Sequence, residues 1–368
     1  MALHLKEKVS RTIGDMRTIA VLVDLIDHEL EKRIVARHLP VKIDGFISLL
    51  SRLKNDLRRN EYKDRPGKLK ALIELTGRLR MDYDGGPLEA ARDAMAGHSL
   101  QMDLSDAADA WTFLGKSTFA ILMSDVDEIE AELKALIPAY VATAPDVLDP
   151  AVKVKWANED HLGDPNAIRL ISTTTGIATA GAVSAMPTMS KSQECLFRAN
   201  SLMTSLFQIR KLIDPVQPFS VIDRVLAEIL INDYLALWEM LFTSGVTNKY
   251  GRIDKCLLDY WTEEAWGGAS ALKALGATPI PDMDLWREQL RNKFTAHIDA
   301  DVDSTFGDLE NWPVSVDTLV RQVQTLIIEF RKCALLDVRS RYIVLPPLPF
   351  GPTVVGISNQ EGKRWDES

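Results

Sequence analysis

The chain has 368 residues, of which 46% are hydrophobic and 26% charged, and its formal net charge is −9 at pH 7. This length suits two helical domains better than one, and an acidic balance argues against a general nucleic-acid coat protein. The longest uncharged run, between Arg169 and Lys191, is rich in Thr, Ser, Ala and Gly, so a membrane span is not expected.

Apolar residues at three- and four-residue spacing predict five helices in the first part of the chain. These helices cover residues 5–34, 41–60, 69–81, a short stretch from about 88, and 119–133. The first ends at Leu39-Pro40, because the residue before proline disfavours the α region. Arg65-Pro66-Gly67 and Asp84-Gly85-Gly86-Pro87 separate the helices that follow.

Helical periodicity fades from about residue 138 to 192, which predicts an inter-domain connection with a short strand or two. Helical patterns resume at about residue 193. They comprise a strong apolar stripe over 222–241, short helices and turns over 251–281, a helix from about 282, and a last helix over 316–330. The tail after Arg341 is rich in proline and predicts an extended arm.

The predicted fold class is therefore all-α, with two related helical-bundle halves. The predicted parts are an N-terminal helical half (1–140), an irregular linker (141–192), a C-terminal helical half (193–340) and an extended proline-rich tail (341–368). Three scattered cysteines without a CxxC pair argue against a disulfide framework, and the first residues do not resemble a signal peptide. Both observations favour the cytoplasm.

A repeated motif is the main signal for function. An Arg, an Asp or Asn, and a His six residues after the Arg occur in both halves: Arg92, Asp93 and His98, then Arg291, Asn292 and His297. Each copy ends a helical segment and precedes an acidic stretch, a tryptophan (Trp111 or Trp312) and a long amphipathic helix. Two such matches arise by chance in about one chain per thousand. A looser match, Arg33 to His38, lacks this context and is interpreted as chance.

These residues resemble the signature of the HEPN superfamily, Arg-x4–6-His, often with Asn, Asp or His after the Arg. The stretch from Leu290 to Asp299 is most similar to the abortive-infection branch. The first copy departs from it, with Gly97 before His98 and Ser99 where the second copy has Ile298. The resemblance implies a metal-independent endoribonuclease of phage defence or a toxin–antitoxin system. Its members act as dimers, so two copies in one chain imply an intrachain pseudo-dimer, with a homodimer as the other arrangement.

The residue types suit RNA cleavage. Histidine titrates near neutral pH and can act as base or acid, and arginine offers a fixed planar charge to phosphate oxygens. The candidate catalytic residues are Arg92, Asp93, His98, Arg291, Asn292 and His297. On a straight helix, an Arg and a His six residues apart lie about 120° apart around the axis. The helix must therefore end or bend near the His, or the two copies must share one site.

A structural interpretation of the same residues remains open. The histidines suit helix C-termini, and the arginines can pair with nearby carboxylates such as Glu89 or Glu288. The alternative function is a non-catalytic interaction module of a defence complex. The expected partners are RNA and an antitoxin or defence-complex protein, and no cofactor or metal is expected.

A basic segment is a further feature open to two interpretations. Residues 1–80 hold 18 Lys and Arg but 11 Asp and Glu, although the whole chain is acidic. The density of positive charge is highest over residues 52–70. This segment is either a solvated helix face with a basic turn or a phosphate-contacting patch.

Overall fold

The computed structural model describes residues 2–26, 29–92, 115–137, 190–213, 220–244, 246–247, 253–280, 283–287, 290 and 312–335. Within these residues the regular elements are helices apart from one pair of two-residue strands, so the prediction of an all-α fold is confirmed. No helix in this part of the chain is both long and apolar enough to cross a membrane.

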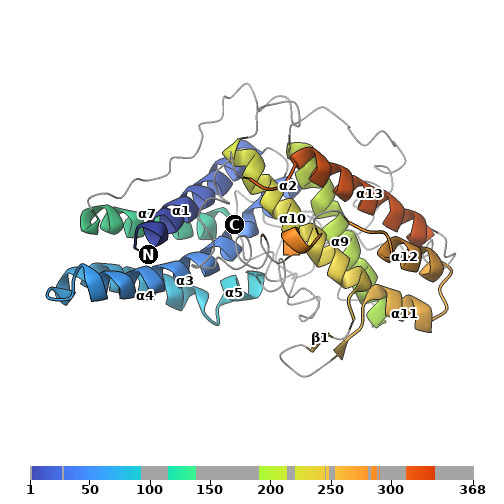
Figure 1. Cartoon of the computed structure of the whole chain (residues 1–368), viewed down its shortest axis with the longest axis horizontal. Helices are drawn as coiled ribbons and strands as arrows, with labels where there is room; N and C mark the ends of the chain where they lie inside the picture. Colours follow the sequence, from blue (N-terminus) through green and yellow to red (C-terminus); the bar gives the residue numbers. More distant parts are fainter. Residues whose placement is uncertain are drawn as a thin grey trace.

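The first group of helices is blue to green in Figure 1. It consists of α1 (Ala2–Leu25), α2 (Glu29–Ala36), α3 (His38–Asn60), the 3-10 turn η1 (Pro66–Leu69), α4 (Lys70–Tyr83), α5 (Pro87–Arg92) and α7 (Lys116–Leu136). Helix α1 packs along α3, and α7 packs against α1 and α4. The short helix α5, which ends at the first motif, lies against α3 and α4.

The second group is yellow to red in Figure 1. It consists of α9 (Lys191–Leu212), α10 (Val221–Phe242), β1 (Val246–Thr247), β2 (Ile253–Asp254), α11 (Leu257–Glu263), α12 (Ala269–Gly276) and α13 (Val316–Leu335). Helix α9 packs along α10, and α13 packs against α9, α10 and α12. The two strands pair antiparallel, with Val246 opposite Asp254.

Helix α10 is the central element of the second group. Ser220 caps its N-terminus in a capping box with Asp223, which satisfies otherwise unpaired backbone N–H groups. Seventeen of its 22 residues are buried, and they include charged side chains as well as apolar ones. It contacts α1 of the first group, while α2 contacts α9, so both groups contribute side chains to one continuous apolar core.

Two details of the predicted helices are wrong. The chain does not form one helix over 5–34: α1 ends at Leu25, and α2 begins at Glu29 and turns toward α9. Pro40 does not end a helix either, because it lies in the first turn of α3, which begins at His38. Proline is tolerated in a first turn, where its missing N–H has no intrahelical acceptor.

The remaining predicted helices match observed ones, with ends shifted by a few residues. The two described strands lie within residues 246–254, and the strands predicted for the linker fall outside the described residues. The predicted linker is described only from residue 190, and the prolines of the predicted tail lie outside the described residues. All three cysteines are buried free thiols.

Candidate functional site

Arg92 is the one residue of the two predicted motifs that the structure describes. Asp93, His98, Arg291, Asn292 and His297 lie outside the described residues. The structure therefore shows the surroundings of the first arginine and the residues that lead to the second motif.

The Arg92 guanidinium is held at the end of α5 by neighbouring side chains. Its Nη1 lies 3.0 Å from Asp44 Oδ2 in α3, and its Nη2 lies 3.7 Å from Glu89 Oε1. Its Cζ lies 5.8 Å from the centroid of the Tyr83 ring, within the range of a cation–π contact. The side chain is half-buried, so the guanidinium is oriented before any ligand arrives.

Two carboxylates partly offset the charge of Arg92. A guanidinium has five N–H donors, and Asp44 and Glu89 lie beside two of the Arg92 nitrogens. Its attraction for an anion is weaker than that of a free arginine, because Asp44 and Glu89 lie close to it. The arrangement suits a phosphate contact of moderate strength.

The segment that leads to the second motif is anchored in the core. Residues 283–287 are helical, and residues 285–287 form a wide π-helical turn. Trp286 and Leu290 are fully buried, and the Trp286 ring packs edge-on against Tyr234 of α10 at a centroid distance of 5.4 Å. A π-turn changes the angular spacing of side chains from that of a straight α-helix, and such turns occur often at functional sites.

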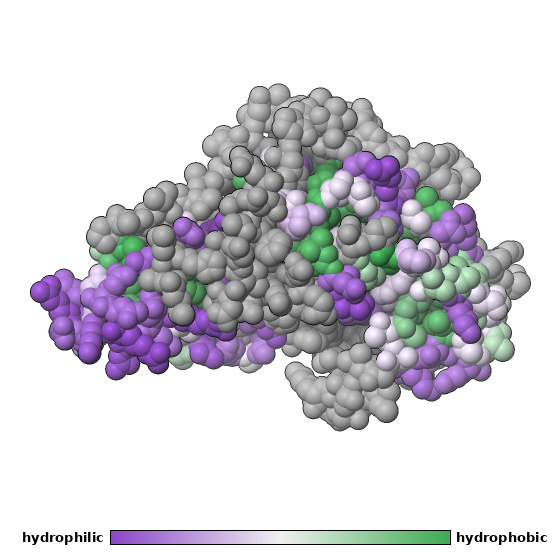
Figure 2. Space-filling view, viewed as in Figure 1, coloured by the Kyte–Doolittle hydropathy of each residue, from purple (hydrophilic) through white to green (hydrophobic). Residues whose placement is uncertain are grey.

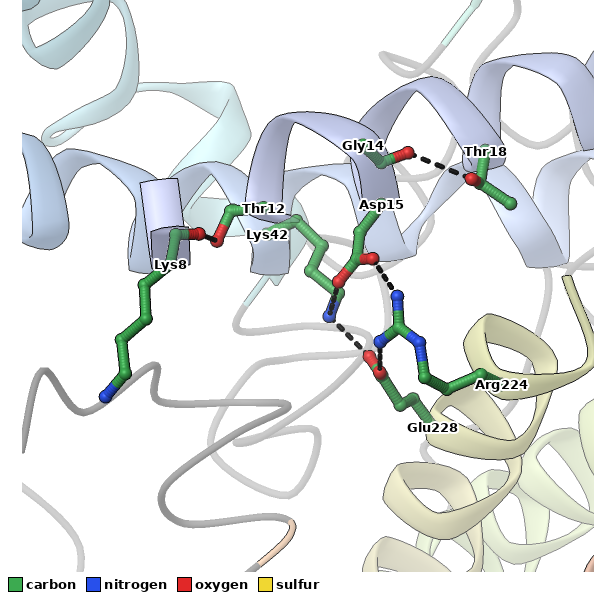
Figure 3. A network of polar contacts seen from close by, with 8 residues as sticks. All are labelled: Lys8, Thr12, Gly14, Asp15, Thr18, Lys42, Arg224 and Glu228. Carbon is green, nitrogen blue, oxygen red and sulfur yellow. Dashed lines mark hydrogen bonds and ion pairs between the residues drawn. The ribbon is translucent and has the colours of Figure 1, made fainter. Parts of the chain in front are cut away.

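A closed ring of four buried charges joins the two groups of helices (Figure 3). Lys42 of α3 and Arg224 of α10 are the cations, and Asp15 of α1 and Glu228 of α10 are the anions. Lys42 Nζ donates to Asp15 Oδ2 at 3.1 Å and to Glu228 Oε2. Arg224 donates to Asp15 Oδ1 and to Glu228 Oε1. Each cation thus contacts both anions, and the four charges cancel.

The ring favours the charged forms of Asp15 and Lys42 although they are buried, whereas at Glu228 burial outweighs the two cations and raises the pKa. Burial opposes ionisation of Asp15, but Arg224 and Lys42 outweigh it and lower its pKa. Burial also opposes the charge on Lys42, yet Glu228 and Asp15 outweigh it and raise the pKa of Lys42. Buried charges are tolerated only when they are paired and hydrogen-bonded, as they are here. Since the ring's charges are all paired, the ring fixes α10 against α1 and α3 and offers no free acid or base.

A second buried polar cluster lies where α3 begins. Arg37 donates to Asp233 Oδ2 in α10 and, at 2.5 Å, to Ser205 Oγ in α9; Ser205 in turn donates to Asp233 Oδ2. Arg37 Nε also donates to His38 Nε2 at 3.2 Å. His38 Nε2 therefore acts as an acceptor, which requires a neutral imidazole.

The titration behaviour of this second cluster follows from its burial. Burial, followed by the charges of Arg37 and Lys42, holds the pKa of His38 well below its usual value. Burial likewise raises the pKa of Asp233, whose Oδ1 accepts no hydrogen bond and lies 3.9 Å from His38 Nε2. His38 is thus an internal residue, in agreement with the interpretation that its match to the motif is chance.

Sequence reasoning missed both buried clusters, although signals for them were present. Asp15 lies among the buried residues Ile13, Met16 and Ile19 of α1. Arg224 and Glu228 lie one helical turn apart within an otherwise apolar run. A charge inside an apolar stripe predicts a buried partner, but the sequence alone does not say which residue that partner is.

Among the described residues, no group of three or more His, Cys, Asp or Glu side chains has the geometry to hold a metal ion. Comparisons of the chain with protein-family models, with curated proteins and with solved structures find no match.

Proposed function

We propose that this protein is a cytoplasmic, metal-independent endoribonuclease of a phage-defence or toxin–antitoxin system. In this proposal the chain is a pseudo-dimer of two HEPN-like halves. Arg92, Asp93 and His98 from one half meet Arg291, Asn292 and His297 from the other around one phosphate.

The observation that carries the proposal is the equivalent packing of the two motif-bearing segments. Each group of helices is built on two long helices packed along each other, α1 with α3 and α9 with α10. A last long helix then contacts the first of each pair, α7 against α1 and α13 against α9, although α7 packs mainly against α4 and α13 packs equally against α10. The first motif begins where α5 lies on α3, and the second follows a segment that lies on α10. This common order supports a duplication in which the motifs have equivalent places.

The arrangement of the two groups also supports a shared site. They contact each other through α1 and α10 and through α2 and α9. In the view of Figure 1, α5 and the segment 283–287 both lie toward the middle of the molecule, near where the groups meet. The ring of buried charges fixes α10 relative to α1 and α3. A site shared between rigidly joined halves is preorganised, as catalysis requires.

The proposed reaction is transfer of the phosphoryl group to the neighbouring 2′-oxygen. One histidine removes the proton from the 2′-hydroxyl, and the oxygen attacks phosphorus to form the second ester bond. The bond to the 5′-oxygen breaks, and the other histidine gives that oxygen a proton. The products are a 2′,3′-cyclic phosphate and a 5′-hydroxyl. Arg92 and Arg291 stabilise the negative charge on the phosphorane oxygens, and Asp93 and Asn292 orient their neighbours.

The alternative function is a non-catalytic interaction module of a defence complex that binds partner proteins. The observation that favours it is the pairing of Arg92 with Asp44 and Glu89, since paired arginines are common in purely structural roles. In this alternative the motifs stabilise the helices, and changing them alters folding but no reaction.

The test is cleavage of labelled RNA by the purified full chain in EDTA. We expect fragments that end in a 2′,3′-cyclic phosphate, and we expect His297→Ala to abolish them. His161→Ala, which removes a histidine outside both motifs, is the matched control and should cleave like the wild type. Cleavage that persists in His297→Ala, or no cleavage by the wild type together with no toxicity on expression, would refute the proposal.

A further inference from the structure

A cluster of exposed cations lies where α3 turns into α4. Residues 52–70 contain eight basic and three acidic residues in a chain whose net charge is −9. Figure 2 shows this end of the molecule as a strongly hydrophilic surface at its left tip. We use the name basic tip for five exposed side chains of this turn: Arg58, Arg59, Lys63, Arg65 and Lys68.

The cations of the basic tip outnumber the carboxylates around them and are not paired. Of the three acidic residues near these cations, Glu61 accepts from Lys6 at 2.7 Å and Asp56 accepts from Asn60 at 2.7 Å. The third, Asp64, is exposed between Lys63 and Arg65 and offsets part of their charge. No ion pair joins the five basic-tip side chains to any other described residue. Several exposed cations elsewhere have carboxylate partners, as in Lys255–Glu263, Arg321–Asp317 and Lys332–Glu329.

The turn that carries these cations is held in place. Leu57 and Leu69 are buried beneath it, and the Tyr62 hydroxyl donates to the Leu136 carbonyl of α7 at 2.5 Å. Pro66 fixes the first position of η1. Next to the turn, burial and then the charge of Arg80 in α4 lower the pKa of Lys54. An anion that binds here gains the attraction of several cations without having to order the backbone.

The chemistry of the basic tip fits a chain of phosphates. Pro66 is the one aliphatic side chain among residues 58–68, and their one aromatic residue, Tyr62, is half-buried and hydrogen-bonds to α7. Nothing at the basic tip is suited to insertion into a bilayer, and nothing offers a platform for stacked bases. Flexible lysines and arginines at an exposed turn suit backbone phosphates, whose neutralisation releases counterions.

We infer that the basic tip binds the phosphate backbone of RNA at a distance from the motif residues, an inference that rests on the proposed function. Asp44, the partner of Arg92, and Arg58 lie fourteen residues apart in α3, which corresponds to about 21 Å along the helix axis. A strand of several nucleotides is needed to reach from one to the other. The basic tip therefore holds long substrates and does not contact short ones.

The first experiment measures binding separately from cleavage. The probe is a 2′-O-methyl RNA of about 20 nucleotides, which lacks the nucleophilic hydroxyl. Arg59→Gln/Lys63→Gln/Lys68→Gln removes one arginine and two lysines from the basic tip. Arg321→Gln/Lys255→Gln/Lys332→Gln removes the same residue types where they are paired. Urea unfolding of both variants confirms that they fold.

At about 50 mM salt we expect the basic-tip variant to bind the probe at least about tenfold more weakly than wild type. Three lost phosphate contacts should also reduce the slope of log K against log salt by about 2. The control variant should stay within about twofold of wild type. Equal loss in both variants, no loss in either, or binding of the wild type to phosphatidylserine vesicles but not to RNA would overturn the inference.

The second experiment measures cleavage and separates the inference from the proposed function. The basic-tip variant should cleave a substrate of about four nucleotides as wild type does, and its kcat/KM should fall only with a long substrate. A fall for both lengths would overturn the remote role of the basic tip. If the wild type binds the 2′-O-methyl probe but cleaves no RNA, the ribonuclease proposal is wrong. If the wild type binds that probe only weakly, the inference that the basic tip binds RNA is wrong.

Discussion

Lys42 in α3 donates to Glu228 in α10, and this buried ion pair joins residues 186 positions apart in the chain. Lys42 also contacts Asp15 in α1. One ammonium group therefore links α3 to α1 of the first group and to α10 of the second. The position of α10 relative to α1 and α3 therefore depends on charge pairing as well as on apolar packing.

Lys42→Met should lower the free energy of unfolding by about 3–5 kcal/mol, because it leaves Asp15 and Glu228 buried with one cation instead of two. Lys255→Met, which removes one half of an exposed ion pair, should cost less than about 1 kcal/mol. Urea unfolding followed by circular dichroism measures both. Equal losses in the two variants would show that the ring of buried charges does not stabilise the contact between the groups.

His38 should make the protein less stable in mild acid. Its pKa is well below the usual value in the folded state, so the unfolded chain binds the proton more tightly. The contribution of neutral His38 to the free energy of unfolding is fully present above the unfolded pKa of about 6.5. It is lost as the pH falls below that value. Between about pH 7.5 and 5.5 the expected loss from this one residue is on the order of 1 kcal/mol.

The control for this pH dependence is His38→Gln, which keeps a hydrogen-bond acceptor near Arg37 but does not titrate. The unfolding free energy of the variant should depend less steeply on pH over the same interval, even if its absolute value is lower. Parallel pH profiles for the two proteins would mean that the imidazole is not held neutral between Arg37, Lys42 and Asp233.

Gly268 and Gly77 should respond to alanine in opposite ways. A Cβ at Gly268 would lie 2.3 Å from the Cys333 carbonyl oxygen of α13, so Gly268→Ala should cost about 1–3 kcal/mol. A Cβ at Gly77, inside α4, would meet nothing within 4 Å, and Gly77→Ala should add about 0.5–1 kcal/mol. Thermal unfolding of both variants shows whether each substitution raises or lowers the stability. If Gly268→Ala stabilised the protein, it would contradict the packing of α12 against α13.

Arg92 and Asp44 allow the catalytic and structural interpretations of the first motif to be separated. Arg92→Gln should reduce kcat/KM for RNA cleavage by about a hundredfold, but should lower stability by less than about 1 kcal/mol because the pair is partly exposed. Asp44→Asn should lower KM, since the arginine charge is less compensated, and should lower kcat, since the guanidinium is less well oriented. A structural role for Arg92 predicts changes in stability alone, with kcat and KM unaffected in the folded fraction.

The helices were predictable from the sequence because apolar spacing reports a buried face directly. The last helix, α13, matches its pattern closely, as do α4 and α7. The break between α1 and α2 was not predictable in this way, because Ile26 and Ile34 continue the apolar stripe across it. There the contact of α2 with α9 determines the path of the chain, and such long-range contacts leave no local signal.

The candidate site was predictable only as a pattern of residue types. The spacing of Arg92 to His98 and of Arg291 to His297 singled out the motifs, but not the partners that surround them. Asp44 lies within α3, and it meets Arg92 only because α5 packs against α3. That contact depends on tertiary packing. The ring formed with Lys42 depends in the same way on how α10 packs against α1.

Cleavage by His98→Ala, His297→Ala and the double variant tests the composite site most directly. One histidine serves as base and the other as acid, so each single variant should lose at least about a hundredfold in kcat, with little further loss in the double variant. If instead each single variant keeps about half of the wild-type rate and only the double variant is inactive, the two motifs act independently and the account of one shared site is wrong.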